Sequence, residues 1–226
     1  MTRCVKLLVF DWDGTLIDSI GHIVETMQAA IRDAGLPQRS EEQIRDIIGL
    51  GMREATARLF PGLDRPELRQ ALGSAYRRRY YANGDEGALF PGVPDALERL
   101  AASGYVLAIA TGKSRQGLDR VLARTGLGHR FRVTRCADEG KSKPHPGMLE
   151  YILSVTAIPA SAALMVGDSG HDLRMAREAG MDAVGVCSGA HDESVLRRCD
   201  PLACLPAVAD LPDWLDSTGL TPAVGG

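Results

Sequence analysis

The stretch VKLLVFDWDGT, residues 5–15, decides how the rest of the sequence is interpreted. Its first half is an almost unbroken apolar run that ends at Asp11, which is typical of a strand buried on both faces of a parallel sheet. Its second half places two aspartates directly after that strand, followed by Gly14, which permits a tight turn. We therefore expect a buried strand with an acidic site at its carboxyl end.

The same pattern, a short apolar run that ends at polar or small residues, recurs along the chain. Further strands are expected at residues 106–110, 162–166 and 183–186, with a weaker one at residues 131–134. Helical patterns lie between the strands, at residues 94–102, 114–125, 146–155 and 172–179. Strands that alternate with helices predict an α/β fold with a doubly wound, mostly parallel sheet.

The segment between the first and second clear strands has a different pattern, with several helical stretches and no strand signal. Ser40 is a candidate N-cap, and Gln43, three residues later, completes a capping box. Further helical stretches are expected at residues 19–35, 52–60 and 66–81. We therefore expect an all-helical cap domain at residues 17–87, inserted into an α/β core formed by residues 1–16 and 88–226.

The composition excludes several classes of function. The 26 Lys and Arg residues are nearly balanced by 29 Asp and Glu residues, and the formal net charge of −3 provides no overall field that attracts nucleic acid. No apolar run approaches the roughly 18–20 residues of a membrane span, and the first run ends too soon for a signal peptide. We expect a cytoplasmic protein with no nucleic-acid or membrane partner.

Polar residues with complementary chemistry follow the expected strands. Ligands of an open α/β sheet bind beyond the carboxyl ends of its strands, so these residues are expected to converge. They are Asp11, Asp13, Thr111, Gly112, Lys143, Asp168 and Asp172. Carboxylates, a hydroxyl and a lysine together suit a hard divalent cation bound beside an anionic phosphoryl group.

The two aspartates of the first motif are suited to different roles. Asp11 and Asp13 lie two positions apart, so an extended chain directs both side chains to the same side. Crowded carboxylates repel, and one of them holds a proton more readily unless a cation neutralises the pair. Because a carboxylate oxygen can attack phosphorus, the pair can divide into a nucleophile and a general acid.

Four ordered motifs carry a resemblance to a known family. They are Asp11-Trp12-Asp13-Gly14-Thr15, Thr111-Gly112, Lys143-Pro144 and Gly167-Asp168-Ser169-Gly170-His171-Asp172. Together they resemble the motifs of the haloacid dehalogenase superfamily, and the helical insertion resembles the small-cap subgroup that includes phosphoglycolate phosphatases. The resemblance extends from residue 8 to about residue 190, and four motifs in order, each after an expected strand, are highly specific.

The resemblance implies catalytic and metal-binding roles. Asp11 would attack phosphorus and form an aspartyl-phosphate, and Asp13 would protonate the leaving alkoxide and then activate water. Mg²⁺ would be held by Asp11, by the backbone carbonyl of Asp13 and by Asp168. Halide-removing members resemble Asp-x-Tyr at the position of Asp13, so dehalogenation is disfavoured.

The other motifs would bind phosphate and support the metal. The resemblance implies that Thr111, the Gly112 amide and Lys143 grip the phosphoryl oxygens. Asp172 would order either the metal's water ligands or Lys143. His171 is expected to be a solvent-facing loop residue and no metal ligand, because hard Mg²⁺ prefers oxygen.

One loop of the cap is a candidate for substrate recognition. In the resembling family such a loop hangs over the active site and selects the substrate. Here Gly49 and Gly51 form the loop, and Arg45 and Arg53 flank it. Either arginine is a candidate partner for a substrate carboxylate.

The resemblance implies an enzyme, a Mg²⁺-dependent phosphatase that hydrolyses a small phosphorylated metabolite, with a phosphoglycolate-type substrate as the nearest candidate. One alternative is a phosphomutase resembling β-phosphoglucomutase, a family whose cap resembles one with a His and a Lys that control the acid. Between residues 18 and 77 this chain has His22 and no Lys. A catalytically idle binding protein with the same fold is a further alternative, and the oligomeric state, monomer or homodimer, is left open.

Overall fold

The computed structural model describes residues 4–82 and 87–220. Within them, a six-stranded sheet has the order β5-β4-β1-β6-β7-β8, and every neighbouring pair is parallel. The strands are β1 Leu7–Phe10, β4 Val106–Thr111, β5 Val133–Cys136, β6 Ala163–Gly167, β7 Asp182–Val186 and β8 Ala203–Leu205. Strand β1 lies between β4 and β6, so the residues that follow it emerge at the centre of the sheet.

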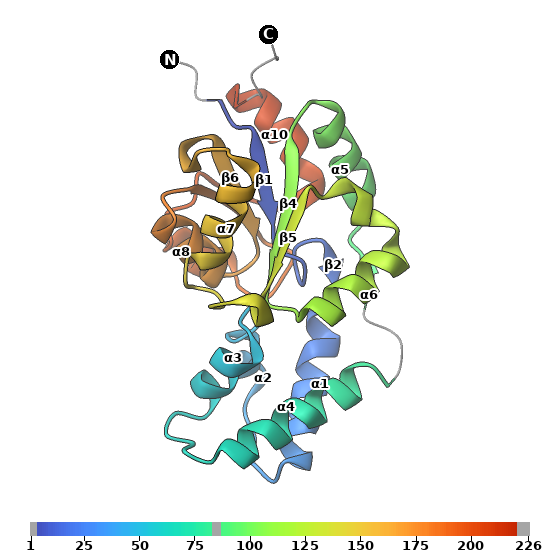
Figure 1. The fold of residues 1–226 in the computed structure, drawn as a ribbon, viewed down its shortest axis with the longest axis vertical. Helices are drawn as coiled ribbons and strands as arrows, with labels where there is room; N and C mark the ends of the chain where they lie inside the picture. Colours follow the sequence, from blue (N-terminus) through green and yellow to red (C-terminus); the bar gives the residue numbers. More distant parts are fainter. Residues whose placement is uncertain (1–3, 83–86, 221–226) are drawn as a thin grey trace.

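Helices cover both faces of the sheet, as Figure 1 shows. One face is covered by α5 Val93–Ala102, α6 Arg115–Thr125 and α10 Leu211–Thr218, whose apolar residues share a cluster with one set of strand residues. The other face is covered by α7 Gly147–Thr156, α8 Gly170–Glu178 and α9 Glu193–Arg197. Short 3-10 helices complete this region, at Leu127–Arg130, Ala137–Glu139, Ala160–Ala162 and Val208–Asp210. The predicted doubly wound α/β fold is confirmed.

The apolar run of β1 is explained by these two layers. Leu8 and Phe10 belong to the cluster on one face, and Leu7 and Val9 belong to the cluster on the other. All four side chains are fully buried. Because successive residues of a strand point to opposite faces, a strand covered on both sides needs apolar residues at every position.

Four helices form a second layer beyond the sheet's carboxyl edge (Figure 1). They are α1 Ile20–Asp33, α2 Glu41–Arg45, α3 Met52–Leu59 and α4 Pro66–Tyr80. The capping box of α2 is confirmed: the Gln43 amide donates to Ser40 Oγ at 3.2 Å, and the Ser40 amide donates to Gln43 Oε1 at 3.0 Å. The helices share their own buried apolar cluster, built from residues 20–81 together with Ala190 of the core.

A small sheet joins the two layers. Strands β2 Ile17–Asp18 and β3 Ala88–Leu89 pair antiparallel where the chain leaves the core and returns to it. The sequence showed no signal for either strand, because two residues are too few to display alternation. The division into a cap at 17–87 and a core remains our interpretation, and residues 83–86, next to its second boundary, lie outside the described part.

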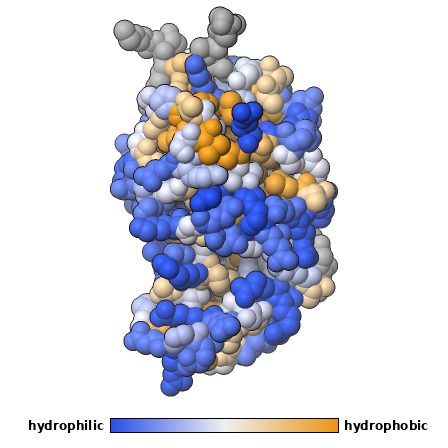
Figure 2. Space-filling model, viewed as in Figure 1, coloured by the Kyte–Doolittle hydropathy of each residue, from blue (hydrophilic) through white to orange (hydrophobic). Residues whose placement is uncertain are grey.

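Other differences from the expectations lie at the edges of elements and of the sheet. The weak strand expected at 131–134 is found at Val133–Cys136, and α8 begins two residues earlier than expected. Strand β8 was missed because its three apolar residues, enclosed by Pro201 and Pro206, are too short a run to predict a strand. Over the residues described, no helix is both long and apolar enough to cross a membrane. Figure 2 shows a mainly hydrophilic surface over the cap in this view.

Candidate active site

The structure brings the predicted acids and lysine together at the carboxyl edge of the sheet. Lys143 Nζ lies 2.7 Å from Asp11 Oδ1 and 2.7 Å from Asp172 Oδ1. Carboxylate oxygens of Asp11, Asp168 and Asp172 all lie within 4.8 Å of one another. These four residues are at most 1% exposed, so side chains from positions 11 to 172 of the chain converge on one buried charged cluster.

Asp11 is held rigidly at the end of β1. Its amide donates to the carbonyl of Val166 at 2.9 Å, and the Trp12 amide donates to Asp11 Oδ1 at 2.6 Å. Lys143 contacts the same oxygen, so Oδ1 is the anchored oxygen of the carboxylate. Burial raises the pKa of Asp11 well above its usual value, although the nearby ammonium of Lys143 opposes the shift.

Asp168 lies in a cradle that the sequence did not reveal. Thr15 Oγ1 donates to Asp168 Oδ1 at 2.8 Å, and the Ala190 amide donates to Oδ2 at 2.7 Å. A Cβ added to Gly14 or Gly189 would lie 2.3 Å or 2.0 Å from this carboxylate, so both positions exclude a side chain. Burial raises the pKa of Asp168 to about 7.

The cluster fits a divalent cation. Three buried carboxylates face one ammonium. Burial alone would lower the pKa of Lys143, but its ion pairs with Asp11 and Asp172 outweigh this effect and raise the pKa above its usual value. The remaining excess of negative charge calls for a proton or a cation. Oxygen donors gathered within so small a space are the ligands that Mg²⁺ prefers.

Asp13 is not part of this cluster and lines the cavity between cap and core. Ser19 Oγ donates to Asp13 Oδ1 at 2.7 Å, and Lys113 Nζ lies 3.1 Å from the same oxygen. Lys113 also donates to the hydroxyl of Tyr80 at 2.9 Å. Ser19 was expected to begin a cap helix, and it occupies the N-cap position of α1, but its hydroxyl donates to Asp13 and not to the helix. No sequence pattern linked Lys113 or Tyr80 to Asp13.

Thr111 and Gly112 lie at the end of β4, next to β1. Thr111 is fully buried, and its Oγ1 accepts a hydrogen bond from the Lys113 amide at 3.2 Å. A Cβ added to Gly112 would lie 2.5 Å from the carbonyl oxygen of Gly49, so a larger residue would push the cap loop away. The position predicted to bind phosphate is therefore also a point of contact between core and cap.

One protein family accounts for three features together: the order of the motifs, the parallel sheet and the charged cluster at its carboxyl edge. The family model described as haloacid dehalogenase-like hydrolase matches residues 8–186, which is most of the chain. The chain belongs to the haloacid dehalogenase-like hydrolase family.

Individual relatives can be aligned with this hydrolase over most of their length. The probable phosphatase IndB of Dickeya dadantii is 35% identical over 199 residues, which cover 86% of each chain. A phosphoglycolate phosphatase of Vibrio cholerae is 32% identical over 208 residues, covering 88% of this chain and 92% of the relative. A crystal structure described as a predicted phosphoglycolate phosphatase from Haemophilus somnus has a TM-score of 0.82 at 27% identity, covering 95% of this chain and 99% of the other.

The cap loop of this hydrolase contacts the core beside the charged cluster. The Gly51 amide donates to Ser142 Oγ at 2.7 Å, and Ser142 is buried next to Lys143 in the chain. A Cβ added to Gly49 would lie 3.7 Å from Asp11 Oδ2, so the loop covers the oxygen of Asp11 that is not anchored. Ser142 was missed because a lone serine before Lys143 carries no signal of a distant partner.

The two arginines that flank the loop lie in different places. Arg45 Nε pairs with Glu41 Oε1 at 2.9 Å, and Arg45 is not among the described residues that line the cavity between cap and core. Arg53 lines that cavity, but its side chain is 87% exposed and lies 3.3 Å from Glu54. The structure therefore brings only Arg53 to the cavity, at its rim.

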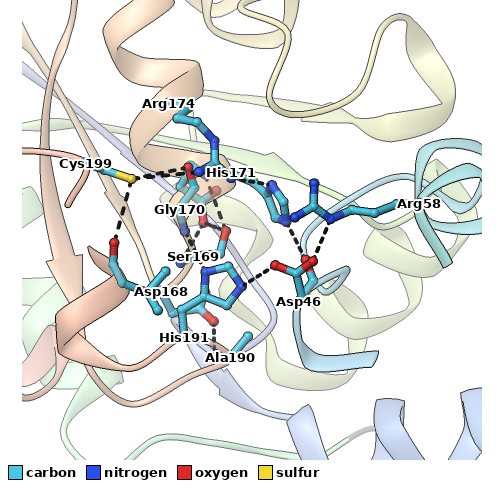
Figure 3. Close-up of polar contacts among 12 residues, drawn as sticks. Asp46, Arg58, Asp168, Ser169, Gly170, His171, Arg174, Ala190, His191 and Cys199 are labelled. Carbon is cyan, nitrogen blue, oxygen red and sulfur yellow. Dashed lines mark hydrogen bonds and ion pairs between the residues drawn. The ribbon is translucent and has the colours of Figure 1, made fainter. Parts of the chain in front are cut away.

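A second contact between cap and core is built on Asp46, at the end of α2 (Figure 3). His171 Nε2 lies 2.7 Å from the Asp46 carbonyl oxygen, and His191 Nε2 lies 3.9 Å from Asp46 Oδ1. Arg58 Nε donates to Asp46 Oδ2 at 2.6 Å. His171 is 1% exposed, which corrects the expectation of a solvent-facing residue: the cap covers it.

This histidine pair does not fit a metal ion. Arg174 donates to His171 Nδ1 at 3.0 Å, and the Gly170 amide donates to His191 Nδ1 at 3.0 Å. Each Nδ1 therefore acts as an acceptor, which leaves the hydrogen on Nε2 of both neutral rings. Burial lowers the pKa of His171 to about 4 and also lowers that of His191. His171 donates from Nε2 to the Asp46 carbonyl, whereas His191 Nε2, 3.9 Å from Asp46 Oδ1, is beyond hydrogen-bond distance. The hydrogen bond from His171 is the contact that ties the end of α2 to the core.

Proposed function

We propose that this hydrolase is a Mg²⁺-dependent phosphatase that cleaves a small phosphate monoester through an aspartyl-phosphate on Asp11. The observation that carries the proposal is the ion-paired triangle of Asp11, Lys143 and Asp172, fully buried at the end of the central strand. Asp11, Asp168 and the Asp13 carbonyl would hold Mg²⁺, which would neutralise charge between the carboxylates and the phosphoryl group.

Asp11 is suited to act as the nucleophile because its two oxygens differ. Oδ1 is held by Lys143 and the Trp12 amide, and Oδ2 faces the cap loop. In the first step Oδ2 attacks phosphorus and the bond from phosphorus to the ester oxygen breaks. The electron pair leaves with that oxygen, which takes a proton from Asp13 and departs as an alcohol.

The second step regenerates the enzyme. Asp13, now a carboxylate, takes a proton from water as that water attacks phosphorus. The bond from phosphorus to Asp11 breaks, inorganic phosphate forms, and the Asp11 carboxylate is restored. Lys113 and Ser19 support this cycle, because their contacts hold Asp13 on the cap side of the nucleophile.

Fixed positive charge would stabilise the phosphoryl group during transfer. The Lys143 ammonium, the Gly112 amide and the Thr111 hydroxyl are the groups we assign to its oxygens, with Asp172 orienting Lys143. Donors that are already in place need no reorganisation when charge moves, and removal of one such group typically lowers the rate by about 100- to 1,000-fold.

The relatives named phosphoglycolate phosphatase make phosphoglycolate the first candidate substrate. In this proposal the loop of Gly49 and Gly51 covers the substrate from the cap, and Arg53 lies at the rim of the cavity. Arg45 would act only indirectly, through α2. The cytoplasmic location stays a prediction.

Release of inorganic phosphate tests this function. Wild-type protein and Asp11→Asn are each assayed on a panel of phosphate monoesters, with Mg²⁺ and with a chelator. We expect turnover by the wild type with Mg²⁺ alone. Activity that depends on added sugar bisphosphate would identify a phosphomutase, and silence on every ester would identify a binding protein.

A further inference from the structure

The cavity between cap and core lies on one side of the nucleophile. It has a volume of about 450 Å³, and Asp13 and Gly112 are in its lining, whereas Asp11 and Lys143 are outside it. Because Asp13 is the group assigned to protonate the leaving oxygen, the cavity begins where the ester oxygen would lie. It is the space available to the alcohol part of the substrate.

The walls of this space are mainly apolar and aromatic. Its lining includes Ile23, Met27, Met52, Tyr76, Tyr80 and Tyr81. The rings of Tyr76 and Tyr80 are stacked, with centroids 5.5 Å apart. Flat rings and flexible methionines are well suited to contact a planar apolar group and gain little from a small charged one.

The charges of the walls do not favour a carboxylate. Three basic residues line the cavity, Arg53, Arg77 and Lys113, and so do three acids, Asp13, Glu54 and Asp138. Lys113 is engaged by Asp13 and by the Tyr80 hydroxyl, and Arg53 faces solvent beside Glu54. The described lining therefore offers a substrate anion no net positive charge beyond the phosphate site.

The volume also exceeds what a two-carbon acid fills. One water occupies about 30 Å³ of liquid, so the cavity has room for roughly 15 waters. Pockets of about 300–1,000 Å³ are the usual size for drug-sized ligands and cofactors, which are larger than a two-carbon acid. Glycolate would leave most of the apolar wall in contact with water.

From these observations we propose that the natural leaving group is a ring-bearing alcohol, planar and largely apolar, that lies against Tyr76 and Tyr81. The proposal rests on the phosphatase function proposed above, and it replaces phosphoglycolate, the candidate suggested by the names of the relatives, with a different substrate class. Full burial of a phenyl-sized group stabilises a complex by about 1.5–3 kcal/mol, which corresponds to about a 10- to 150-fold gain in kcat/KM.

A matched pair of esters tests the proposal. Ethyl phosphate and 2-phenylethyl phosphate have leaving alcohols of similar acidity and differ in the ring, so their kcat/KM ratio measures the contact with the cavity. We expect the wild-type protein to favour the phenyl ester by about 10-fold or more and to favour it over phosphoglycolate. Tyr76→Ala should reduce the ratio several-fold, and Tyr76→Phe, which keeps the ring, should preserve it.

The outcomes separate this proposal from the general function. If ethyl phosphate is hydrolysed but the two alkyl esters react equally, or if phosphoglycolate is the better substrate, the ring proposal is overturned and the phosphatase function stands. If no ester yields phosphate, the general function fails and the ring proposal fails with it. The wild-type ratio decides the matter even if Tyr76→Ala does not fold.

Discussion

Two parts of the site are built differently: the buried charged cluster, here called the floor, and the cap residues that line the cavity, here called the wall. On the floor, Asp11, Lys143, Asp168 and Asp172 are at most 1% exposed and are tied together by charged contacts. In the wall, formed by Tyr76 and the other cap residues that line the cavity, the contacts are mainly apolar, and Arg53 points to solvent. In the proposed mechanism the floor determines which bond is broken, and the wall determines which molecule is admitted.

This difference has a physical cause. A charge buried without partners is expensive, so each floor residue depends on its neighbours and few replacements are compatible with the cluster. Apolar contacts are less directional, and swaps that preserve volume are tolerated. We therefore expect substitutions on the floor to abolish chemistry and substitutions in the wall to shift substrate preference.

The largest expected effect is that of Asp11→Asn. An amide is a poor nucleophile, and we expect kcat/KM to fall by about 1,000-fold or more. Phosphate release from a monoester measures the loss, with thermal unfolding as the control for folding. A variant that keeps a tenth of the wild-type activity would remove Asp11 from the mechanism.

Lys143→Met should affect both chemistry and stability. The change leaves Asp11 and Asp172 buried without their cation, and breaking a buried pair in this way lowers stability by about 3–5 kcal/mol. Urea unfolding with and without Mg²⁺ measures the change, and we expect Mg²⁺ to restore part of it. Unchanged stability of the metal-free variant would contradict the charge balance described for the floor.

Removal of the metal should be visible without any substrate. A cation that binds the folded state alone stabilises it, by about 2.7 kcal/mol at 100 times the dissociation constant. We expect Mg²⁺ to raise the melting temperature of the wild type and to have little effect on Asp168→Asn. An equal rise in both proteins would place the cation elsewhere.

His171→Ala should loosen the cap with less effect on chemistry. The variant loses the hydrogen bond to the Asp46 carbonyl, and a hydrogen bond of this kind contributes about 0.5–1.5 kcal/mol. We expect KM to rise about three- to ten-fold, kcat to change less, and hydrogen exchange to speed up at residues 46–51. If exchange in this loop is unaltered, the contact does not hold the cap.

The smallest effect belongs to Arg53→Ala. Its side chain is 87% exposed beside Glu54, and such surface pairs contribute about 0–1 kcal/mol. We expect kcat/KM to change less than about five-fold for phosphoglycolate and for ethyl phosphate alike. A large loss confined to phosphoglycolate would support direct recognition of a carboxylate by the cap and would weaken the contrast between floor and wall.

The sequence predicted the floor well because its signals are local. Asp11 and Asp168 directly follow apolar runs, and parallel strands bring their carboxyl ends to one edge. The helices of the cap were likewise visible in capping residues such as Ser40. The contacts that hold the floor residues in place, such as Thr15 with Asp168, had no local signal.

The cap side of the site was predicted less well, for the same reason. Lys113 and Ser142 acquire their roles through partners more than 30 residues away in the chain. His171 was expected to face solvent, and it is buried because α2 lies across it. The hydrophobic periodicity of a sequence indicates which face of a helix or strand is buried. It does not indicate which distant segment covers that face.

The most direct test of the account is to trap the intermediate. The Asp13→Asn variant lacks the base that activates water in the second step. It is mixed with Mg²⁺ and an aryl phosphate, whose leaving group departs without a proton from Asp13, and quenched in acid, and its peptides are analysed by mass spectrometry. The account predicts one phosphoryl group on Asp11 that is absent from the doubly substituted Asp11→Asn, Asp13→Asn protein. Phosphate release by the wild type with no phosphoryl group ever found on Asp11 would contradict it.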